Sequence, residues 1–208
     1  MHLILASGSE GRRHLLSLLQ IPFTVVPSAI DEEKIQGKNP LDTIQLRAQR
    51  KAEDVAKIIT LSKNIKTNHL FEEDKEALVL SADSSVIFQN TLYGKPKDYE
   101  DAKRMLKSFS GKTHEFVTAI CIIKVQKTSK GGYLTRKIAE EYDRSYITFR
   151  SLTDEEIDVY LSRTAYKKFA GSYDLLDSSQ TFIVNVKGSP SNVTGLPLEI
   201  LLPYLQKA

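Results

Sequence analysis

The hydrophobic pattern of this chain alternates between two periods from one end to the other. Short apolar runs that are typical of buried strands occupy residues 3–6, 23–26 and 77–80. Between them, residues 41–59 carry apolar side chains at helical spacing, and Asn39 and Pro40 form a favourable helix start. Because strands and helices interleave, the pattern predicts an α/β fold with a mixed sheet flanked by helices.

The second half of the chain predicts a hairpin of two long strands. One extended stretch covers residues 114–125 and the other runs from about 133 to 149, with Gly131 and Gly132 in the loop between them. The other elements expected after residue 97 are a helix capped by Asp98, a helix with a capping box at Thr153 and Glu156, a strand at 181–186 and a last helix opened by Pro197. The hairpin makes the predicted sheet mixed, not purely parallel.

The whole chain, residues 1–208, is expected to form a single domain. Its length suits one domain or one domain with two lobes. Residues 60–76 are polar and charged without clear periodicity, which predicts a surface loop insertion and not a linker between domains.

The charge balance argues against nucleic acids and membrane surfaces as partners. The chain has 29 basic and 26 acidic residues, and its net charge of +3 is too small to favour either. No segment has the length of a membrane span, and the apolar run at residues 3–6 is too short for a signal peptide. Cys121 is the only cysteine, so no disulfide can form within the chain. We therefore expect a cytoplasmic protein.

The turn after the first predicted strand is suited to holding an anion. Residues 7–11 read Ser-Gly-Ser-Glu-Gly and lead into a helix that opens with Arg12 and Arg13. Hydroxyls, backbone N–H groups and the positive end of a helix converge in such a turn, and arginine matches phosphate oxygens with a planar fork. The segment lacks the Gly-Lys-Ser/Thr of a Walker A loop. Taken alone, an ordinary strand-turn-helix with surface arginines is the more common explanation.

Asp83 is the first candidate for a catalytic or metal-binding residue. It follows the apolar run 77–80 and is flanked by small residues, so we place it where a buried strand ends. Ligands bind at the carboxyl ends of strands in open α/β sheets, and a carboxylate there can hold a divalent metal or accept a proton from water. An aspartate that satisfies the turn after a strand fits the position equally well.

Four more charged residues are candidates for chemistry. Lys95 lies in a Gly-Lys-Pro turn that would hold its ammonium on a constrained loop. Lys51 follows Arg47 by four residues, so the two share one face of the predicted helix. Asp31 and Glu32 could supply metal ligands from an acidic loop. Side chains in water are the more common explanation for both lysines, and a solvated acidic loop remains open for the carboxylates.

Other common catalytic arrangements find no support. Histidines 2, 14, 69 and 114 are scattered without zinc-like spacing, and there is no Gly-x-Ser-x-Gly elbow. His114, inside an alternating strand, is expected to be structural, and Cys121, inside an apolar run, is expected to be a buried, inert thiol.

Nine motifs, in order along nearly the whole chain, together resemble those of the Maf family of nucleoside triphosphate pyrophosphatases. They are Leu5-Ala6-Ser7-Gly8-Ser9-x-x-Arg12-Arg13-x-Leu15-Leu16, Ile30-Asp31-Glu32, Arg47-Ala48-x-x-Lys51-Ala52, Ala82-Asp83-Ser84, Gly94-Lys95-Pro96-x-Asp98, Ser110-Gly111-Lys112-Thr113-His114, the run from Phe149-Arg150 to Glu156-Ile157, Ala170-Gly171-Ser172-Tyr173, and Val193-Thr194-Gly195-Leu196-Pro197. Each is weak alone, but nine in the right order are hard to obtain by chance.

The resemblance implies an elongated Maf/ITPase-like domain with a cleft between two lobes. It implies hydrolysis of a nucleoside triphosphate to the monophosphate and pyrophosphate, with Mg²⁺ or Mn²⁺ as the cofactor. The family's catalytic aspartate falls on Asp83, which would also bind the metal together with Glu32. Its other active-site positions fall on Ser7, Ser9, Arg12, Lys51 and Lys95. A homodimer would be unsurprising for such a protein.

The departures from the family pattern concentrate where the base would be recognised. The family's base-discriminating positions fall on Gly11, Ser84 and Leu176, and Leu176 cannot make the hydrogen bonds of a glutamine or glutamate. The triphosphate machinery is intact, so the departures bear on substrate identity more than on activity. Clearing non-standard or modified nucleotides is one role that such an enzyme would serve.

Two other functions stay open at this point. One is a regulatory module of the same fold that binds nucleotides with little or no turnover. The changed residues at the base-discriminating positions motivate this alternative. The other is a nucleic-acid-binding protein, whose affinity would depend strongly on salt. The balanced charge argues against the second.

Overall fold

The computed structural model describes residues 2–61, 76–175 and 177–206. Within these residues, one mixed sheet has the strand order β2-β1-β3-β5-β6-β7, and β4 pairs with β3 beside this path. The strands are β1 (His2–Leu5), β2 (Phe23–Val25), β3 (Glu76–Phe88), β4 (Thr91–Tyr93), β5 (Thr113–Lys127), β6 (Tyr133–Phe149) and β7 (Ile183–Lys187). The α/β class with a mixed sheet is therefore confirmed.

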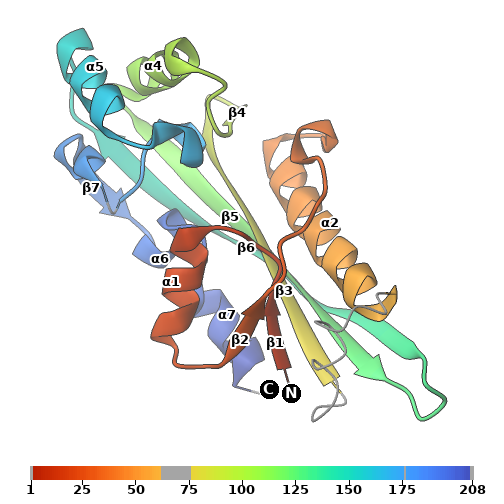
Figure 1. Cartoon of the computed structure of the whole chain (residues 1–208). Helices are drawn as coiled ribbons and strands as arrows, with labels where there is room; N and C mark the ends of the chain where they lie inside the picture. The colour runs from red at the N-terminus through yellow and green to blue at the C-terminus, as the bar shows by residue number, and fades with distance from the viewer. Residues whose placement is uncertain (1, 62–75, 176, 207–208) are drawn as a thin grey trace.

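The helices lie on both faces and at one end of this sheet (Figure 1). The α-helices are α1 (Glu10–Leu18), α2 (Pro40–Leu61), α4 (Tyr99–Phe109), α5 (Asp154–Arg163), α6 (Pro190–Val193) and α7 (Leu198–Leu205). Short 3-10 turns are η1 (Glu32–Lys34), η3 (Tyr166–Lys168), η4 (Ala170–Ser172) and η5 (Ser178–Thr181). No helix among the described residues is both long enough and apolar enough to span a membrane.

Alternate residues of each central strand belong to different cores. Ala77 and Val79 of β3 pack with the apolar face of α2, whereas Leu78 and Leu80 pack with Leu16 of α1 and with α7 on the opposite face. This is the period-two alternation of a sheet that is covered on both sides. A third core, at the α4–α5 end, is rich in aromatic rings. Figure 1 shows α2 on one side of the sheet and α1 with α7 on the other.

One edge of β3 has a gap between its partner strands. β1 runs parallel to β3 and ends with Leu5 opposite Leu80, and β4 joins the same strand only at Val86, opposite Tyr93. Residues 81–85 thus have no strand partner on this side within the described pairings, while their other side pairs with β5. We call residues 81–85 the open edge of β3. The turn that follows β1 and the turn that follows β4 flank this open edge.

The structure corrects the predicted strand end at Asp83. β3 continues through this residue to Phe88, and Asp83 pairs with Ala119 in mid-strand. The polar residues of the open edge do not break the strand, because their side chains find partners on both faces. Ser81 Oγ donates to Ala48 O of α2, and Ser84 Oγ on the other face bonds Arg12 and Thr118. The strand that ends at this level is the shorter neighbour β1, whose last residue Leu5 lies opposite Leu80, so the site forms where β1 stops.

Two smaller predictions are also corrected. Thr60 and Leu61 belong to α2 and Glu76 belongs to β3, while the rest of the predicted 60–76 loop lies outside the described residues. The strand expected at 181–186 is β7, which begins only at Ile183. The helix starts at Pro40 and Asp98 and the capping box of α5 are confirmed.

Candidate functional site

The N-terminal turn arranges its two serines around the start of α1. Ser9 caps the helix and its hydroxyl accepts a hydrogen bond from Arg12 N at 3.4 Å. The Ser7 hydroxyl accepts from Ser9 N at 3.2 Å and is buried. A serine at the N-cap satisfies a helix N–H that would otherwise lack a partner. The turn therefore brings hydroxyls to a helix N-terminus, as the sequence predicts.

Arg12 links this turn to two distant parts of the chain. Its Nη1 donates to Ser7 Oγ at 3.0 Å, its Nη2 donates to Ser84 Oγ at 3.0 Å, and its Nε donates to Gly195 O at 2.8 Å. Gly195 has φ = +103°, and a Cβ there would lie 3.3 Å from Ser84 Oγ and 3.5 Å from Arg12 Nε. A glycine is therefore needed for this approach. The guanidinium is fixed at the open edge of β3.

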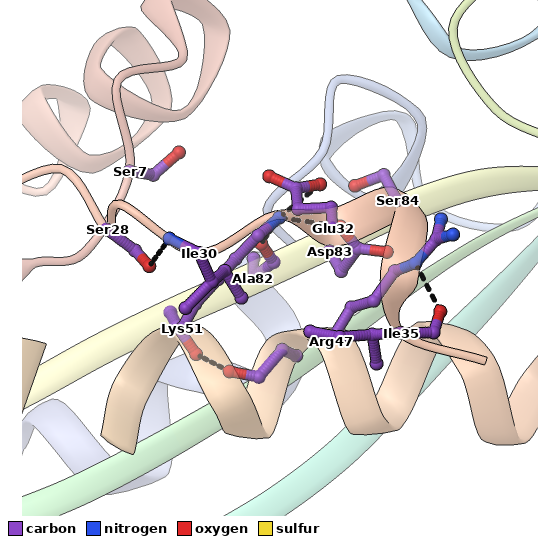
Figure 2. Close-up of polar contacts among 12 residues, drawn as sticks. Ser7, Ser28, Ile30, Glu32, Ile35, Arg47, Lys51, Ala82, Asp83 and Ser84 are labelled. Atoms are coloured by element: carbon purple, nitrogen blue, oxygen red, sulfur yellow. Dashed lines mark hydrogen bonds and ion pairs between the residues drawn. The ribbon is translucent and has the colours of Figure 1, made fainter. Parts of the chain in front are cut away.

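Lys51 of α2 bridges two carboxylates at the same edge (Figure 2). Its Nζ donates to Asp83 Oδ1 at 2.6 Å and pairs with Glu32 Oε2 at 2.9 Å, with Ala82 O a further 3.4 Å contact. Lys51 and Asp83 are both buried, whereas the Glu32 side chain is half-exposed on η1. Lysines are almost never buried unless they are paired. Lys51 is therefore not the solvated helical lysine that its sequence context allows.

The charges at the open edge shift one another's protonation equilibria. Burial raises the pKa of Asp83, and the Glu32 carboxylate adds to this against the opposing effect of Lys51. Although burial alone would raise it, the Lys51 ammonium holds the pKa of Glu32 below its ordinary value. Burial lowers the pKa of Arg12, and the charges of Asp83 and Glu32 oppose that shift. These four groups form one electrostatic unit.

Asp83 and Ser84 point to opposite faces of β3, yet they serve one site. Asp83 faces α2 and contacts Lys51, while Ser84 faces the α1 side and accepts from Arg12. In a fully paired sheet such side chains would be separated by the neighbouring strand. Here β1 has already ended, and the charges of Arg12 and Asp83 act on each other across the open edge.

One oxygen of Asp83 is without a partner. Within the part of the chain that the structure describes, Asp83 Oδ2 is buried and accepts no hydrogen bond. An unpaired buried carboxylate oxygen is costly, and a bound cation would satisfy it. No group of three or more acidic, histidine or cysteine side chains forms a complete metal cage among the described residues. Two carboxylates fit Mg²⁺ or Mn²⁺, since Mg²⁺ is typically held by one or two carboxylates together with substrate phosphates.

Lys95 lies on the second turn that flanks the open edge, two residues after β4. Gly94 O accepts from Gly171 N at 2.9 Å, and Pro96 is buried, so the turn is held on both sides of the lysine. The Lys95 side chain is exposed, and the described residues make no hydrogen bond or ion pair with it. Its constrained backbone is as predicted, while its role remains a prediction.

The base-discriminating positions are only partly described. A Cβ on Gly11 would lie 3.1 Å from Thr194 O, so a larger residue would push α1 away from the turn that follows α6. Ser84 is already engaged by Arg12 and by Thr118, whose Oγ1 lies 2.9 Å away. Leu176 lies outside the described residues. How the residues at these three positions would contact the base is therefore untested.

Two supporting residues escaped the sequence analysis. Thr118 of β5 backs Ser84, and its hydroxyl also lies 2.9 Å from Asn192 O of α6. The Asn192 amide donates to Phe116 O at 3.0 Å and to Ser145 Oγ at 2.9 Å. The Ser189–Pro190 pair is a typical N-cap and first-turn signal for α6 and could have revealed this helix.

Neither Cys121 nor His114 belongs to the site. Cys121 is fully buried, and burial raises the pKa of its thiol to about 12. His114 is buried among aromatic rings and its Nε2 bonds Tyr173 OH at 2.8 Å. The expected burial of the thiol and the structural position of the histidine are both confirmed.

Comparison with known proteins gives a consistent result over the full chain. A family model described as Maf-like protein matches residues 2–208. The dTTP/UTP pyrophosphatase of Bacillus cytotoxicus is 35% identical over 204 residues, which cover 98% of this chain and 94% of the relative. The dTTP/UTP pyrophosphatase of Treponema denticola is 35% identical over 212 residues, covering 99% and 96%.

A solved structure, the Staphylococcus aureus Ham1 protein, matches with a TM-score of 0.44 and 11% identity, covering 100% of this chain and 99% of that chain. At this level the likeness supports no statement about the present chain.

Proposed function

Because this chain belongs to the Maf family, we propose that it hydrolyses a nucleoside triphosphate to the monophosphate and pyrophosphate. The observation that carries the proposal is the meeting of Arg12, Lys51, Glu32 and Asp83 at the open edge of β3. They come from four separate segments. A triphosphate needs both cations and a held divalent metal to neutralise its charge, and this edge offers the groups for both.

In the proposed reaction, water attacks the α-phosphorus. The new bond joins the water oxygen to that phosphorus, the α–β phosphoanhydride bond breaks, and pyrophosphate leaves. The Asp83 carboxylate accepts the proton from the attacking water and later releases it to solvent. Support comes from its burial and its raised pKa, which make it a stronger base than a solvated aspartate.

The cations would bind the triphosphate and the leaving group. The substrate would lie against the turn of Ser7 and Ser9 with Arg12 beside it, while Lys51 and Lys95 would neutralise charge that develops on pyrophosphate. Lys51 is already held by its two carboxylates, so little reorganisation is needed at the moment of reaction. Lys95 is placed here by its motif and by its turn beside the open edge.

Glu32 and Asp83 Oδ2 would hold the divalent metal. When bound, Mg²⁺ or Mn²⁺ supplies positive charge that offsets the charge of the phosphates. The unpaired Oδ2 and the half-exposed Glu32 fit this role. The protein's own contribution is Lys51, which lies between the two carboxylates, lowers the pKa of Glu32 and opposes the burial that raises the pKa of Asp83.

The relatives suggest one class of substrate, and the sequence suggests a second. The relatives named above are dTTP/UTP pyrophosphatases, so pyrimidine triphosphates are the first substrates that we propose. Gly11, Ser84 and Leu176 depart from common patterns, so a modified or non-standard base is the second. Residence in the cytoplasm and a homodimer stay predictions.

The test is pyrophosphate release over a panel that includes dTTP, UTP, the purine triphosphates and base-methylated nucleotides. We expect release from at least one of them in the presence of Mg²⁺ or Mn²⁺, and a fall of at least about 100-fold for Asp83→Asn with nucleotide binding retained. Tight binding without release from any nucleotide would instead favour the regulatory module. Full activity of Asp83→Asn would overturn the role given to that residue.

A further inference from the structure

Residues 28–39, the segment that carries Glu32, are attached to one side of helix α2. The contacts follow the helix in order. Near its C-terminal end, Asp54 Oδ2 accepts from Ser28 Oγ and from Ala29 N at 2.9 Å each, and Lys51 pairs with Glu32 at 2.9 Å. Nearer its start, Arg47 Nε donates to Ile35 O at 3.2 Å, and Thr43 Oγ1 accepts from Gly37 N at 2.9 Å. The segment therefore runs antiparallel to the helix. Figure 2 shows Arg47 and Lys51 rising from α2 toward it.

These four helix residues form a single polar stripe. Thr43, Arg47, Lys51 and Asp54 are separated by steps of four, four and three, which places them on one face of an α-helix. The apolar stripe of Ile44, Ala48, Ala52 and Val55 lies beside it and packs on the sheet. One face of α2 thus belongs to the core, and the adjacent face holds the segment.

The segment has little else to fix it. None of residues 28–39 is buried, and its regular structure is the one 3-10 turn η1, which Ile35 N closes onto Glu32 O at 3.2 Å. Ordering each residue of a chain costs conformational entropy. Since no side chain of the segment is fully buried, apolar burial offsets little of this cost, and the polar stripe supplies most of the contacts that place the Glu32 carboxylate.

We propose that Asp54, helped by Arg47, is a positioning residue that holds Glu32 in place to bind the divalent metal. This inference rests on the proposed function. Asp54 fixes the start of the segment through Ser28 and Ala29, and Arg47 fixes its end through Ile35. Neither contact involves the reacting groups. Residues that orient metal ligands from outside the coordination shell are typically worth about 10-fold to 100-fold in metal affinity.

Asp54 gives the cleaner test, because an arginine at position 47 can also bind a phosphate directly. Asp54→Ala removes both contacts to the segment. Asp54→Asn keeps an amide oxygen that can occupy the place of Oδ2 and accept from both Ser28 Oγ and Ala29 N, so it should restore most of the effect. The matched control is Glu53→Ala, a neighbouring, similarly exposed carboxylate whose contacts, to Gln49 and Arg50, stay within α2.

Two measurements separate positioning from a loss of folded protein. Binding of Mn²⁺ alone, followed by electron paramagnetic resonance, should be about tenfold weaker in Asp54→Ala than in Glu53→Ala, with Asp54→Asn close to wild type. The Mn²⁺ concentration for half-maximal pyrophosphate release should rise by a similar factor. In a Glu32→Gln background, adding Asp54→Ala should change neither quantity further, because the residue acts through Glu32.

The inference is overturned if Asp54→Ala and Glu53→Ala bind Mn²⁺ equally, if the two substitutions at positions 32 and 54 are additive, or if the wild-type chain binds no Mn²⁺. Absence of pyrophosphate release by the wild type would defeat the proposed function instead. In that case Mn²⁺ binding by Asp54→Ala, Asp54→Asn and Glu53→Ala still decides whether Asp54 is a positioning residue.

Discussion

Two regions of the same sheet bury polar side chains, and they treat them in opposite ways. At the open edge of β3, Asp83 and Lys51 are buried as a close ion pair, with Glu32 as a second carboxylate partner. At the α4–α5 end, His114 is buried in a cluster with Phe109, Phe149 and Tyr173, which we call the aromatic cluster. Both regions leave one buried polar atom unpaired among the described residues.

The difference between them is charge. His114 stacks on Phe109 with ring centroids 4.4 Å apart, and burial lowers its pKa to about 3, so the ring is neutral near pH 7. Its unpaired Nδ1 therefore belongs to a neutral ring, and leaving a neutral nitrogen unpaired costs less than leaving a charged group unpaired. The unpaired Oδ2 of Asp83 belongs to a carboxylate beside a cation. Of these two regions, the open edge is the one in which a buried charged group lacks a full set of partners among the described residues, and such a group is what a ligand would satisfy.

The largest effect should come from removing the charge balance at the open edge. Lys51→Met leaves Asp83 and Glu32 without their shared cation, and breaking a buried pair in this way costs about 3–5 kcal/mol. We expect pyrophosphate release to fall by at least about 100-fold, and urea unfolding at pH 7 to show the loss of stability.

The double variant Lys51→Met/Asp83→Asn separates the two effects. It removes both buried charges, so most of the stability should return while activity stays lost. If Lys51→Met were as stable as wild type and still active, the open edge would not depend on this ion pair and the comparison would fail.

A smaller effect is expected from crowding Arg12. In Gly195→Ala, the new Cβ lies 3.3 Å from Ser84 Oγ, which must give way by a few tenths of an ångström, and alanine rarely adopts the backbone φ of +103°. Both effects disturb the Ser84 hydroxyl and the Gly195 carbonyl that accept hydrogen bonds from Arg12. We expect about tenfold lower pyrophosphate release, mainly through a raised KM, from the loss of about one charge-assisted hydrogen bond.

Gly131→Ala is the matched control for this substitution. Gly131 also has a positive φ, +83°, but nothing lies within 4 Å of its added Cβ. It should lose stability from backbone strain and keep its full rate. Equal loss of rate in both variants would show that strain, and not the position of Arg12, governs the effect.

The aromatic cluster should affect stability and not turnover. Because the pKa of His114 is lowered from its ordinary value of 6.5 to about 3, the neutral ring contributes stability above pH 6.5 that is lost as the pH falls from there toward 3. Between pH 7 and pH 5 this amounts to about 2 kcal/mol. His114→Phe should abolish that share of the pH dependence in urea unfolding while pyrophosphate release at pH 7 persists. An unchanged slope in the variant would assign the pH dependence to other groups.

The elements with clear periodicity could be predicted from the sequence, and the open edge could not. The apolar spacing of α2 and its start at Pro40 were sufficient to place that helix. Residues 81–85 look like a strand end because small polar residues interrupt the hydrophobic run. Only tertiary packing shows otherwise, since Ser81 Oγ donates to Ala48 O of α2 at 2.5 Å and the strand stays covered.

The candidate site was predicted as a set of residues and not as a geometry. Motif positions named Arg12, Lys51 and Asp83, and the structure brings them together. The Arg12 contact to Gly195 O joins residues 183 apart through a backbone carbonyl, which has no sequence signature. The role of Asp54 was missed for a similar reason, because its partners are a serine and a backbone N–H in a distant loop.

The most direct test of the central claim is hydrolysis of the preferred nucleoside triphosphate in ¹⁸O-labelled water, with the products followed by ³¹P NMR. Attack at the α-phosphorus, with the open edge of β3 supplying Asp83 and the cations, predicts one ¹⁸O in the monophosphate and none in the pyrophosphate. Label in pyrophosphate, or release of orthophosphate as the first product, would contradict the account.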